Sequence, residues 1–115
     1  MSEIILRPKM EFDVPVEAEA ISPDLFQGRS REEIENLPLF LGNKKMALKD
    51  LFLIEGDPSV EILIEGDLSR VKKIGYGMSQ GRIQIKGNVG MHTGATMSGG
   101  EILVEGDAQD WLGAE

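Results

Sequence analysis

One histidine and several pairs of carboxylates are the side chains in this sequence that could do chemistry. His92 stands in the segment Gly90-Met91-His92-Thr93-Gly94, and an imidazole there could act as a general base in acyl transfer. On a hexapeptide-repeat β-helix, such a histidine would be accompanied by an apolar residue at every sixth position. This sequence repeats over 19 to 21 residues instead. The alternative is an exposed histidine in a turn.

Acidic pairs that follow apolar stretches could supply oxygen ligands to a calcium ion. Calcium requires about six to eight oxygens that converge on one point. Lys86 and Asn88 occupy the corresponding places in one of these stretches, so a solvated outer face is favoured over a metal site. The pairs are Glu55 with Asp57, Glu65 with Asp67, and Glu105 with Asp107.

Composition argues against cofactor sites of other kinds. The sequence has no cysteine, which excludes disulfides and thiolate ligation of zinc or iron–sulfur clusters. Its 14 glycines include no G-x-x-x-x-G-K-S/T phosphate loop. We therefore predict that this chain binds no cofactor or metal and has no catalytic residue of its own.

Charge and hydropathy restrict the partners. The net charge is −8 at pH 7, and the sequence has no basic stripe that could displace counterions from nucleic-acid phosphates. It has no apolar run of about 18 residues that could cross a membrane, and its first residues lack the apolar core of a signal peptide. We expect a cytoplasmic protein that binds neither nucleic acid nor membrane.

A repeated strand pattern organises the second half of the chain. Residues 61–67, 82–88 and 101–107 each alternate polar and apolar side chains and then reach a glycine, and these glycines are 21 and 19 residues apart. Strands stacked about 4.8 Å apart would share an apolar column that one strand alone cannot bury. The pattern predicts a right-handed parallel β-helix, or solenoid, of about 20 residues per rung. Its structural core would be Ile62, Ile64, Ile83, Ile85, Ile102 and Val104.

Charged positions support the same register. Opposite charges on adjacent strands attract, and like charges repel, by a few tenths to about 1 kcal/mol. Two outward columns of the predicted stack alternate acid, base and acid. They are Glu61, Arg82 and Glu101, and then Glu65, Lys86 and Glu105.

Glycines mark the corners between the predicted strands, where φ can be positive and backbones approach closely. The predicted turn glycines are Gly66, Gly87, Gly94, Gly100 and Gly106.

Apolar side chains at outward strand positions form a candidate interface. Leu63 and Leu103 stand where the middle strand has Gln84, and Trp111 follows in the last repeat. Apolar side chains on an outer face need cover. A partner protein could supply it, and the alternative is packing against residues 1–58 of the chain itself.

Residues 1–58 lack the repeat and are predicted to form a small N-terminal α+β cap, with residues 59–115 forming β-helix repeats truncated at the C-terminus. Ser22 before Pro23 and a capping box at Ser30 predict two helix starts. Residues 39–48 predict a β-hairpin. The strand-like residues 51–57 lie too close to the first repeat to complete a rung. We expect them to pair through a turn at 57–59 or to occupy another face.

The whole chain resembles the N-terminal part of the C subunit of formylmethanofuran dehydrogenase and the related subunit of bacterial formyltransferase/hydrolase complexes. The matching segments are residues 4–8 (IILRP), 41–45 (LGNKK), 65–75 (EGDLSRVKKIG) and 86–95 (KGNVGMHTGA), of which the last two are the most specific. The repeats are also similar, more weakly, to the C-terminal glycine-rich β-helix of the large glutamate synthase subunit.

The first resemblance implies a non-catalytic structural subunit of a complex that reversibly reduces carbon dioxide to N-formylmethanofuran in methanogenesis or one-carbon metabolism. It further implies that partner subunits hold molybdopterin with molybdenum or tungsten, iron–sulfur clusters and a metal pair. Members of the family have more rungs than this chain. Two alternatives stay open: a glutamate-synthase-like β-helix domain module, and a free-standing β-helix acyltransferase that uses His92.

Overall fold

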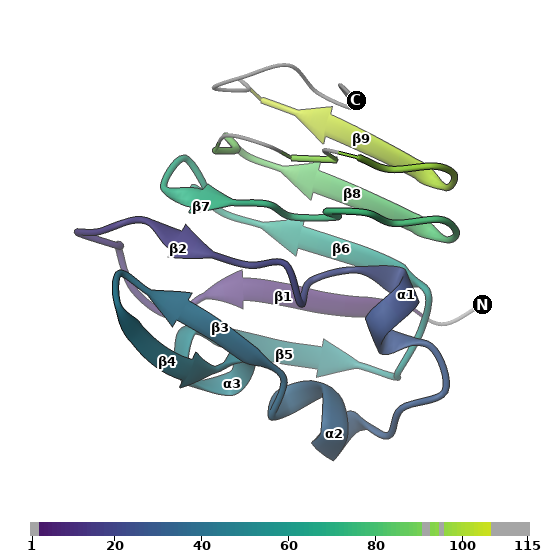
Figure 1. The fold of residues 1–115 in the computed structure, drawn as a ribbon, viewed down its shortest axis with the longest axis horizontal. Coiled ribbons are helices and arrows are strands. Elements are labelled where there is room, and N and C mark those ends of the chain that lie inside the picture. The colour runs from purple at the N-terminus through teal and green to yellow at the C-terminus, as the bar shows by residue number, and fades with distance from the viewer. Residues whose placement is uncertain (1–2, 91–92, 95, 107–115) are drawn as a thin grey trace.

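Two mixed β-sheets pack face to face, with three short helices beside them among the residues that the structure describes (Figure 1). The structure is a computed structural model and describes residues 3–90, 93–94 and 96–106. The five-stranded sheet has the order β5-β1-β6-β8-β9, and the four-stranded sheet has the order β4-β3-β2-β7.

The elements of the five-stranded sheet are β1 (Ile4–Pro8), β5 (Phe52–Gly56), β6 (Glu61–Glu65), β8 (Arg82–Lys86) and β9 (Glu101–Glu105). Those of the four-stranded sheet are β2 (Val16–Glu17), β3 (Pro38–Leu41), β4 (Lys44–Ala47) and β7 (Val71–Lys72). The helices are α1 (Pro23–Phe26), α2 (Arg31–Glu35) and α3 (Leu48–Leu51). None of these helices is long and apolar enough to cross a membrane.

The right-handed parallel β-helix predicted for the second half is wrong, and the fold is a small mixed α/β arrangement. A solenoid needs several faces of each rung to pair in parallel with the next rung. Here β1 runs antiparallel to β5, and β3 runs antiparallel to both β2 and β4. Between β6 and β8 the chain forms only the two-residue β7 and an isolated bridge from Leu68 to Val89, so no second continuous parallel ladder develops within the described residues.

The predicted register of the three similar strands is confirmed. β6, β8 and β9 are parallel, and Glu61 faces Arg82, which in turn faces Glu101. The column that begins at Glu65 follows the same pattern. The alternation of apolar and charged side chains was therefore sufficient to predict how these strands align.

Strand β1 was not expected in this sheet. It lies between β5 and β6, antiparallel to the first and parallel to the second. The expected pairing of residues 51–57 through a turn at 57–59 does not occur, because β1 separates the two strands. The sheet therefore joins strands from both sides of residue 58, and the division into domains at that residue stays a prediction.

Capping side chains set the helix starts as predicted. The Ser22 hydroxyl accepts a hydrogen bond from the Asp24 N–H, and Pro23 begins α1. Ser30 and Glu33 form a reciprocal capping box at α2. The hairpin of β3 and β4 is also confirmed. Helix α3 was missed; the Asp50 carboxylate accepts from the N–H of Ala47 at its start.

The main core lies between the two sheets. Ile4, Leu6 and Ile64 are fully buried on the inner face of the five-stranded sheet, and Val16 and Leu39 are fully buried on the facing sheet. Phe12 and Phe52 pack with their ring centroids 6.1 Å apart. Each such apolar side chain contributes about 1.5–3 kcal/mol on burial.

Candidate functional site

The outer face of the five-stranded sheet carries an apolar row bordered by charge. The register aligns Ile5, Leu63, Gln84 and Leu103 across β1, β6, β8 and β9. We call these four residues the outer row. Leu53 lies on the same face at the β5 edge and is 52% exposed.

Burial varies along the outer row. Leu63 is 8% exposed, whereas Ile5, Gln84 and Leu103 are half-buried. Leu63 sits between two neighbouring strands and between two charged columns, whose aliphatic stems can cover it. Leu103 lies on β9 at the edge of the sheet, so it is the more accessible of the two predicted contact leucines. Trp111, the third predicted contact residue, lies outside the described residues.

Ion pairs link the charged columns that border the outer row. Arg82 Nε lies 3.4 Å from Glu101 Oε1. Arg7 Nε lies 2.9 Å from Glu65 Oε1, and Arg7 also pairs with Glu55. The two hydrogen bonds of Arg7 raise the pKa of its guanidinium, and the bond to Glu55 has the larger effect. Solvent screens exposed pairs of this kind, so they add little to stability.

Sequence reasoning missed Ile5 and Arg7. The acid–base alternation held the signal that could have found Arg7: Glu65 needs a basic neighbour on the side away from Lys86, and Arg7 occupies that place beside β6. The outer face therefore presents apolar side chains between charges that neutralise each other, which suits contact with another protein surface.

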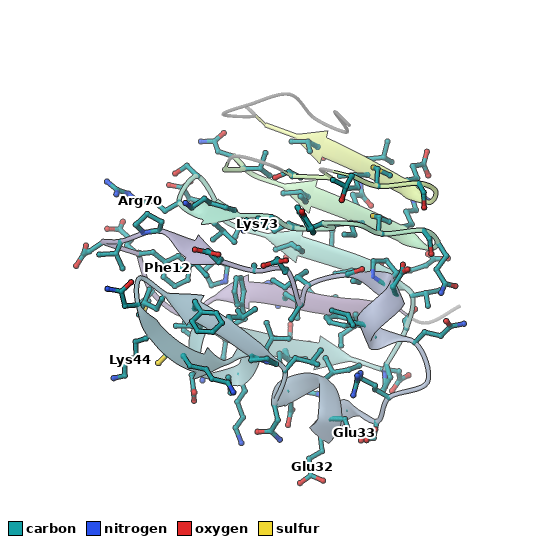
Figure 2. The ribbon with its side chains drawn as sticks, viewed as in Figure 1. Phe12, Glu32, Glu33, Lys44, Arg70 and Lys73 are labelled. Atoms are coloured by element: carbon teal, nitrogen blue, oxygen red, sulfur yellow. The ribbon has the colours of Figure 1, made fainter. Side chains whose placement is uncertain are left out.

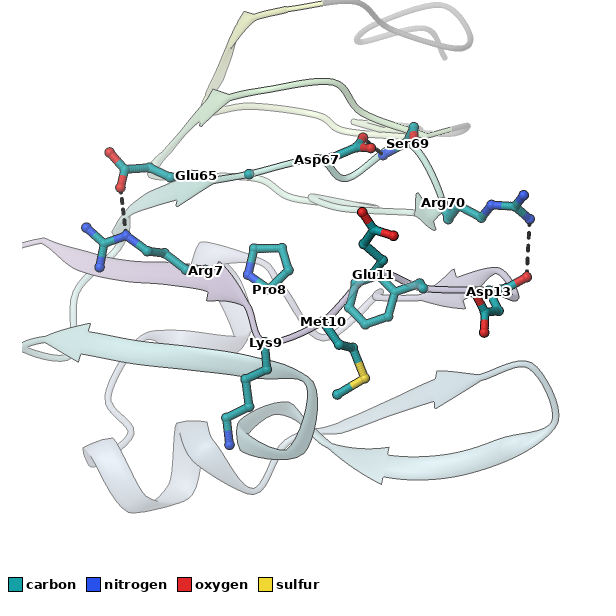
Figure 3. A pocket seen from close by; sticks show the side chains of 12 residues that line it. Arg7, Pro8, Lys9, Met10, Glu11, Asp13, Glu65, Asp67, Ser69 and Arg70 are labelled. Carbon is teal, nitrogen blue, oxygen red and sulfur yellow. Dashed lines mark hydrogen bonds and ion pairs between the residues drawn. The ribbon is translucent and has the colours of Figure 1, made fainter.

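A cleft of about 740 Å³ opens beside this face, between the segment after β1 and the turn after β6 (Figure 3). Its lining mixes acidic and basic side chains with the exposed Met10. Arg70 Nη1 donates to the backbone oxygen of Asp13 at 3.4 Å. Asp67 Oδ1 accepts from the Ser69 N–H at 3.0 Å, and this bond together with one from the Ser69 hydroxyl lowers the pKa of Asp67.

The cleft offers no catalytic constellation among the described residues that line it. Hydrogen bonds to Ser69 occupy Asp67, and Glu65 is paired with Arg7. Within the described part of the chain, no group of three or more His, Asp or Glu residues could hold a metal ion. Arg7 and Arg70 instead link the two chain segments, through Glu65 and through the backbone oxygen of Asp13.

The predicted core residues divide between full and partial burial. Ile64, Ile83 and Ile85 are fully buried, and Ile62 is 2% exposed. Ile102 and Val104, on the edge strand β9, are half-buried and pack against the core.

The predicted turn glycines lie at strand ends and in the connecting turns. Gly66, Gly87 and Gly106 directly follow β6, β8 and β9, and a Cβ on Gly106 would meet the carbonyl oxygen of Gly87 at 2.2 Å. Gly94 and Gly100 have φ values of +72° and +80°. His92 lies outside the described residues.

Comparison with known proteins gives the family. No family model matches the chain. Over 100 residues the chain is 46% identical to the C subunit of the tungsten-containing formylmethanofuran dehydrogenase 2 of Methanothermobacter marburgensis, in a match that covers 83% of this chain and 37% of that relative. The chain belongs to the family of formylmethanofuran dehydrogenase C subunits.

Another relative is the C subunit of the molybdenum-containing formylmethanofuran dehydrogenase 1 of Methanosarcina barkeri, 44% identical over 97 residues that cover 80% of this chain and 32% of the relative. Among solved structures, a chain of the formyltransferase/hydrolase complex (FhcABCD) of Methylorubrum extorquens, in complex with methylofuran, superposes with a TM-score of 0.73. It is 28% identical, and the match covers 90% of this chain and 46% of that one. The chain thus spans less than half the length of these relatives.

Proposed function

We propose that this chain is a non-catalytic structural part of a formylmethanofuran dehydrogenase complex, which reversibly reduces carbon dioxide to N-formylmethanofuran. The 46% identity to a C subunit over 100 residues carries the proposal. The structural similarity to a chain of a multi-subunit formyltransferase/hydrolase complex supports it. The proposed setting is methanogenesis or one-carbon metabolism in the cytoplasm.

The cofactors of the reaction would reside in partner subunits. The relatives are named for tungsten or molybdenum, and molybdopterin, iron–sulfur clusters and a metal pair are the expected partner-held groups. The family resemblance supports this assignment. The role of this chain would be to hold the partner subunits in place.

The outer row is the proposed contact with another subunit. Leu103 in this row and Leu53 on the same face offer accessible apolar surface, whereas Leu63 lies buried within the row. Paired charges around the row reduce the cost of desolvation on binding, because each already has an opposite charge beside it. Trp111 stays a predicted member of this contact.

Native purification tests the proposal. The tagged chain, expressed in its own host and purified gently, should bring down a pterin-binding subunit and an amidohydrolase-like subunit, and the eluate should oxidise formylmethanofuran. Recovery of the chain without these subunits would contradict the proposed function. In that event, acyl transfer by wild type and by His92→Ala should be compared.

A pair of leucine variants tests the contact surface. Leu103→Asp should reduce co-purification of the partner subunits, because it places a charge in the apolar row. Leu25→Asp is the matched control, since Leu25 is 39% exposed on α1, outside the five-stranded sheet. Leu63→Asp is less informative because burial of Leu63 makes its loss a threat to folding. Equal recovery of partners by Leu103→Asp and Leu25→Asp would contradict the contact.

A further inference from the structure

The outer face of the four-stranded sheet carries a second continuous row of side chains. Val16, Leu39 and Val71 are fully buried on its inner side, so the alternate residues of these strands point outward. The register aligns four of them across β7, β2, β3 and β4. They are Lys72, Glu17, Phe40 and Lys45, which we call the basic row.

Phe40 is the apolar centre of the basic row. It is 43% exposed, although the residue before it, Leu39, is fully buried. An aromatic side chain left half in water at the middle of a sheet face offers a large contact area at low cost in conformational entropy. Lys45 is exposed beside it on β4.

The face that carries Phe40 has several lysines, whereas the molecule as a whole is acidic. Lys45 lies on β4, Lys72 lies on β7, and Lys73 directly follows β7 (Figure 2 faces this sheet and labels Lys73), whereas the chain as a whole has a net charge of −8. Glu17 and Glu19 are the acidic neighbours, and Lys73 Nζ lies 3.4 Å and 3.7 Å from their carboxylates.

Pairing of these glutamates with Lys73 leaves the other lysines of this face available. The pKa of Lys73 is raised mainly by its hydrogen bond to Glu17, and further by the negative charges of Glu19 and Glu17. Its ammonium also lies 5.8 Å from the centroid of the Tyr76 ring. No ion pair among the described residues involves Lys45 or Lys72. Within the described part of this face, these two lysines therefore lack a carboxylate partner of their own.

We propose that the basic row docks an acidic segment of a partner protein, with carboxylates on Lys45 and Lys72 and an apolar side chain on Phe40. Charge complementarity of this kind steers association and fixes register. The proposal rests on the proposed function, since the segment would belong to another subunit of the same complex. It names a second contact surface, on the side of the molecule opposite the outer row.

A polyanion fits this face less well. Nucleic acid or an anionic membrane would meet Glu17 within the row, Glu19 beside Lys73, and a chain with a net charge of −8. Binding to phosphate backbones gains most from uninterrupted basic stripes. An aromatic centre between two separated lysines favours a protein segment of mixed acidic and apolar character.

Carbodiimide coupling in the native complex tests the proposal directly, because it joins only an amine and a carboxylate that are in contact. Mass spectrometry should find Lys45 or Lys72 joined to an Asp or Glu of another subunit. Acetylation of these lysines should be slower in the complex than in the chain alone. Lys9 supplies the comparison, since it is also exposed and lies in the cleft. Equal acetylation of Lys45 and Lys72 with and without partners would overturn the proposal.

Charge reversal gives the second readout. The double variant Lys45→Glu with Lys72→Glu should lower recovery of the partner subunits at least about tenfold, and Lys9→Glu should leave it unchanged. Circular dichroism should show that all variants fold.

Partner recovery by the double variant equal to that by Lys9→Glu overturns this inference and leaves the proposed function standing. A wild-type chain recovered without partners overturns both. Binding to RNA or to phosphatidylserine vesicles that the double variant abolishes would assign the face to those ligands instead.

Discussion

At the scale of single residues, glycine sets how closely the ends of β6, β8 and β9 can stack. A Cβ on Gly87 would lie 1.8 Å from the carbonyl oxygen of Gly66, and the φ of Gly87 is +149°. No rotation of a side chain relieves this contact, because the Cβ meets backbone. Gly87 and Gly106 are therefore required by the spacing of the ladder itself, because a Cβ on either would meet the backbone of the preceding strand end.

Gly87→Ala should lower the free energy of unfolding by about 3 kcal/mol or more, since the backbone must move apart. Gly28→Ala is the matched control: Gly28 has a φ of +74°, but a Cβ there meets nothing within 4 Å. It should cost only about 1–2 kcal/mol from the left-handed conformation. Urea unfolding of both variants measures the difference. Equal losses would show that close approach at Gly87 is unimportant.

Asp24 provides a titratable contact between α1 and the turn before β8. Its carboxylate accepts from the Ser79 hydroxyl at 2.6 Å and from the Ser79 N–H at 3.0 Å. Both bonds lower the pKa of Asp24, and the bond from the Ser79 hydroxyl has the larger effect. Because the pKa of Asp24 is lower in the folded state, its ionised carboxylate stabilises the fold, and this contribution to the free energy of unfolding is complete at neutral pH. It declines as the pH falls toward about 3.9, the pKa of an unfolded aspartate, and vanishes below the folded-state value.

Asp24→Asn should therefore destabilise the protein by about 1 kcal/mol at neutral pH, and the difference from wild type should shrink as the solution becomes acidic. Ser79→Ala should show the same convergence, because it removes the same hydroxyl contact. Chemical unfolding at pH 7 and at pH 3 measures both. A difference from wild type that persists unchanged at pH 3 would contradict the role of the ionised carboxylate.

At the scale of elements, the sequence predicted what depends on neighbours or on strict alternation. The Ser22 and Ser30 caps, the β3–β4 hairpin and the register of β6, β8 and β9 were all foreseeable. The insertion of β1 between β5 and β6 was not, because pairing between distant segments leaves no periodic signal. Nor could the two-residue strand β7 be found, since two residues carry no period.

The same distinction applies to the candidate surfaces. Leu63 and Leu103 were identified from their outward positions, and the structure places them in one row. The basic row joins β2 and β7 to the predicted β3–β4 hairpin, and these three segments lie far apart in the sequence. Glu17, Lys72 and the hairpin residues have no common spacing, so only the fold brings them together.

Arg31 closes one edge of the five-stranded sheet. Its guanidinium donates to the carbonyl oxygen of Gly56 at 3.1 Å and to that of Ile54, on the edge strand β5. Glu35 holds the side chain through an ion pair at 3.2 Å. An edge strand with free carbonyls invites pairing with another chain, so Arg31 occupies the place that an added strand would take.

Arg31→Ala should make the chain associate at high concentration, because the β5 edge becomes available. Sedimentation velocity at increasing protein concentration measures this. Glu35→Gln is the control, since it removes the ion pair but leaves the guanidinium able to reach the carbonyls. Sedimentation of Arg31→Ala identical to that of wild type at every concentration would show that the edge is blocked by other means.

At the scale of the whole molecule, the two sheets turn unlike faces outward. The outer row lies between mutually paired charges, and the basic row places Phe40 between Glu17 and Lys45, with Lys72 beyond Glu17. The molecule is 21 Å across its shortest axis, along which Figure 1 is viewed. Sites this far apart, without shared contacts, act independently.

Combining Leu103→Asp with the double lysine reversal should therefore multiply their separate effects on partner recovery. Each surface contributes its own binding free energy, and the free energies add when sites do not contact each other. Quantitative mass spectrometry of purified complexes measures the three recoveries. A combined effect no larger than the greater single effect would show that both variants disrupt one and the same contact.

The central place of β1 has a consequence for how the nascent chain folds on the ribosome. β1 pairs with β5 and β6, and Arg7 and its partner Glu65 are 58 residues apart in the sequence. At about 5–20 residues per second, the stretch from Arg7 to Glu65 takes roughly 3–12 s to translate, so β1 lacks β6 during that time. Until β5 and β6 have been synthesised, the apolar side chains of β1 are open to chaperones.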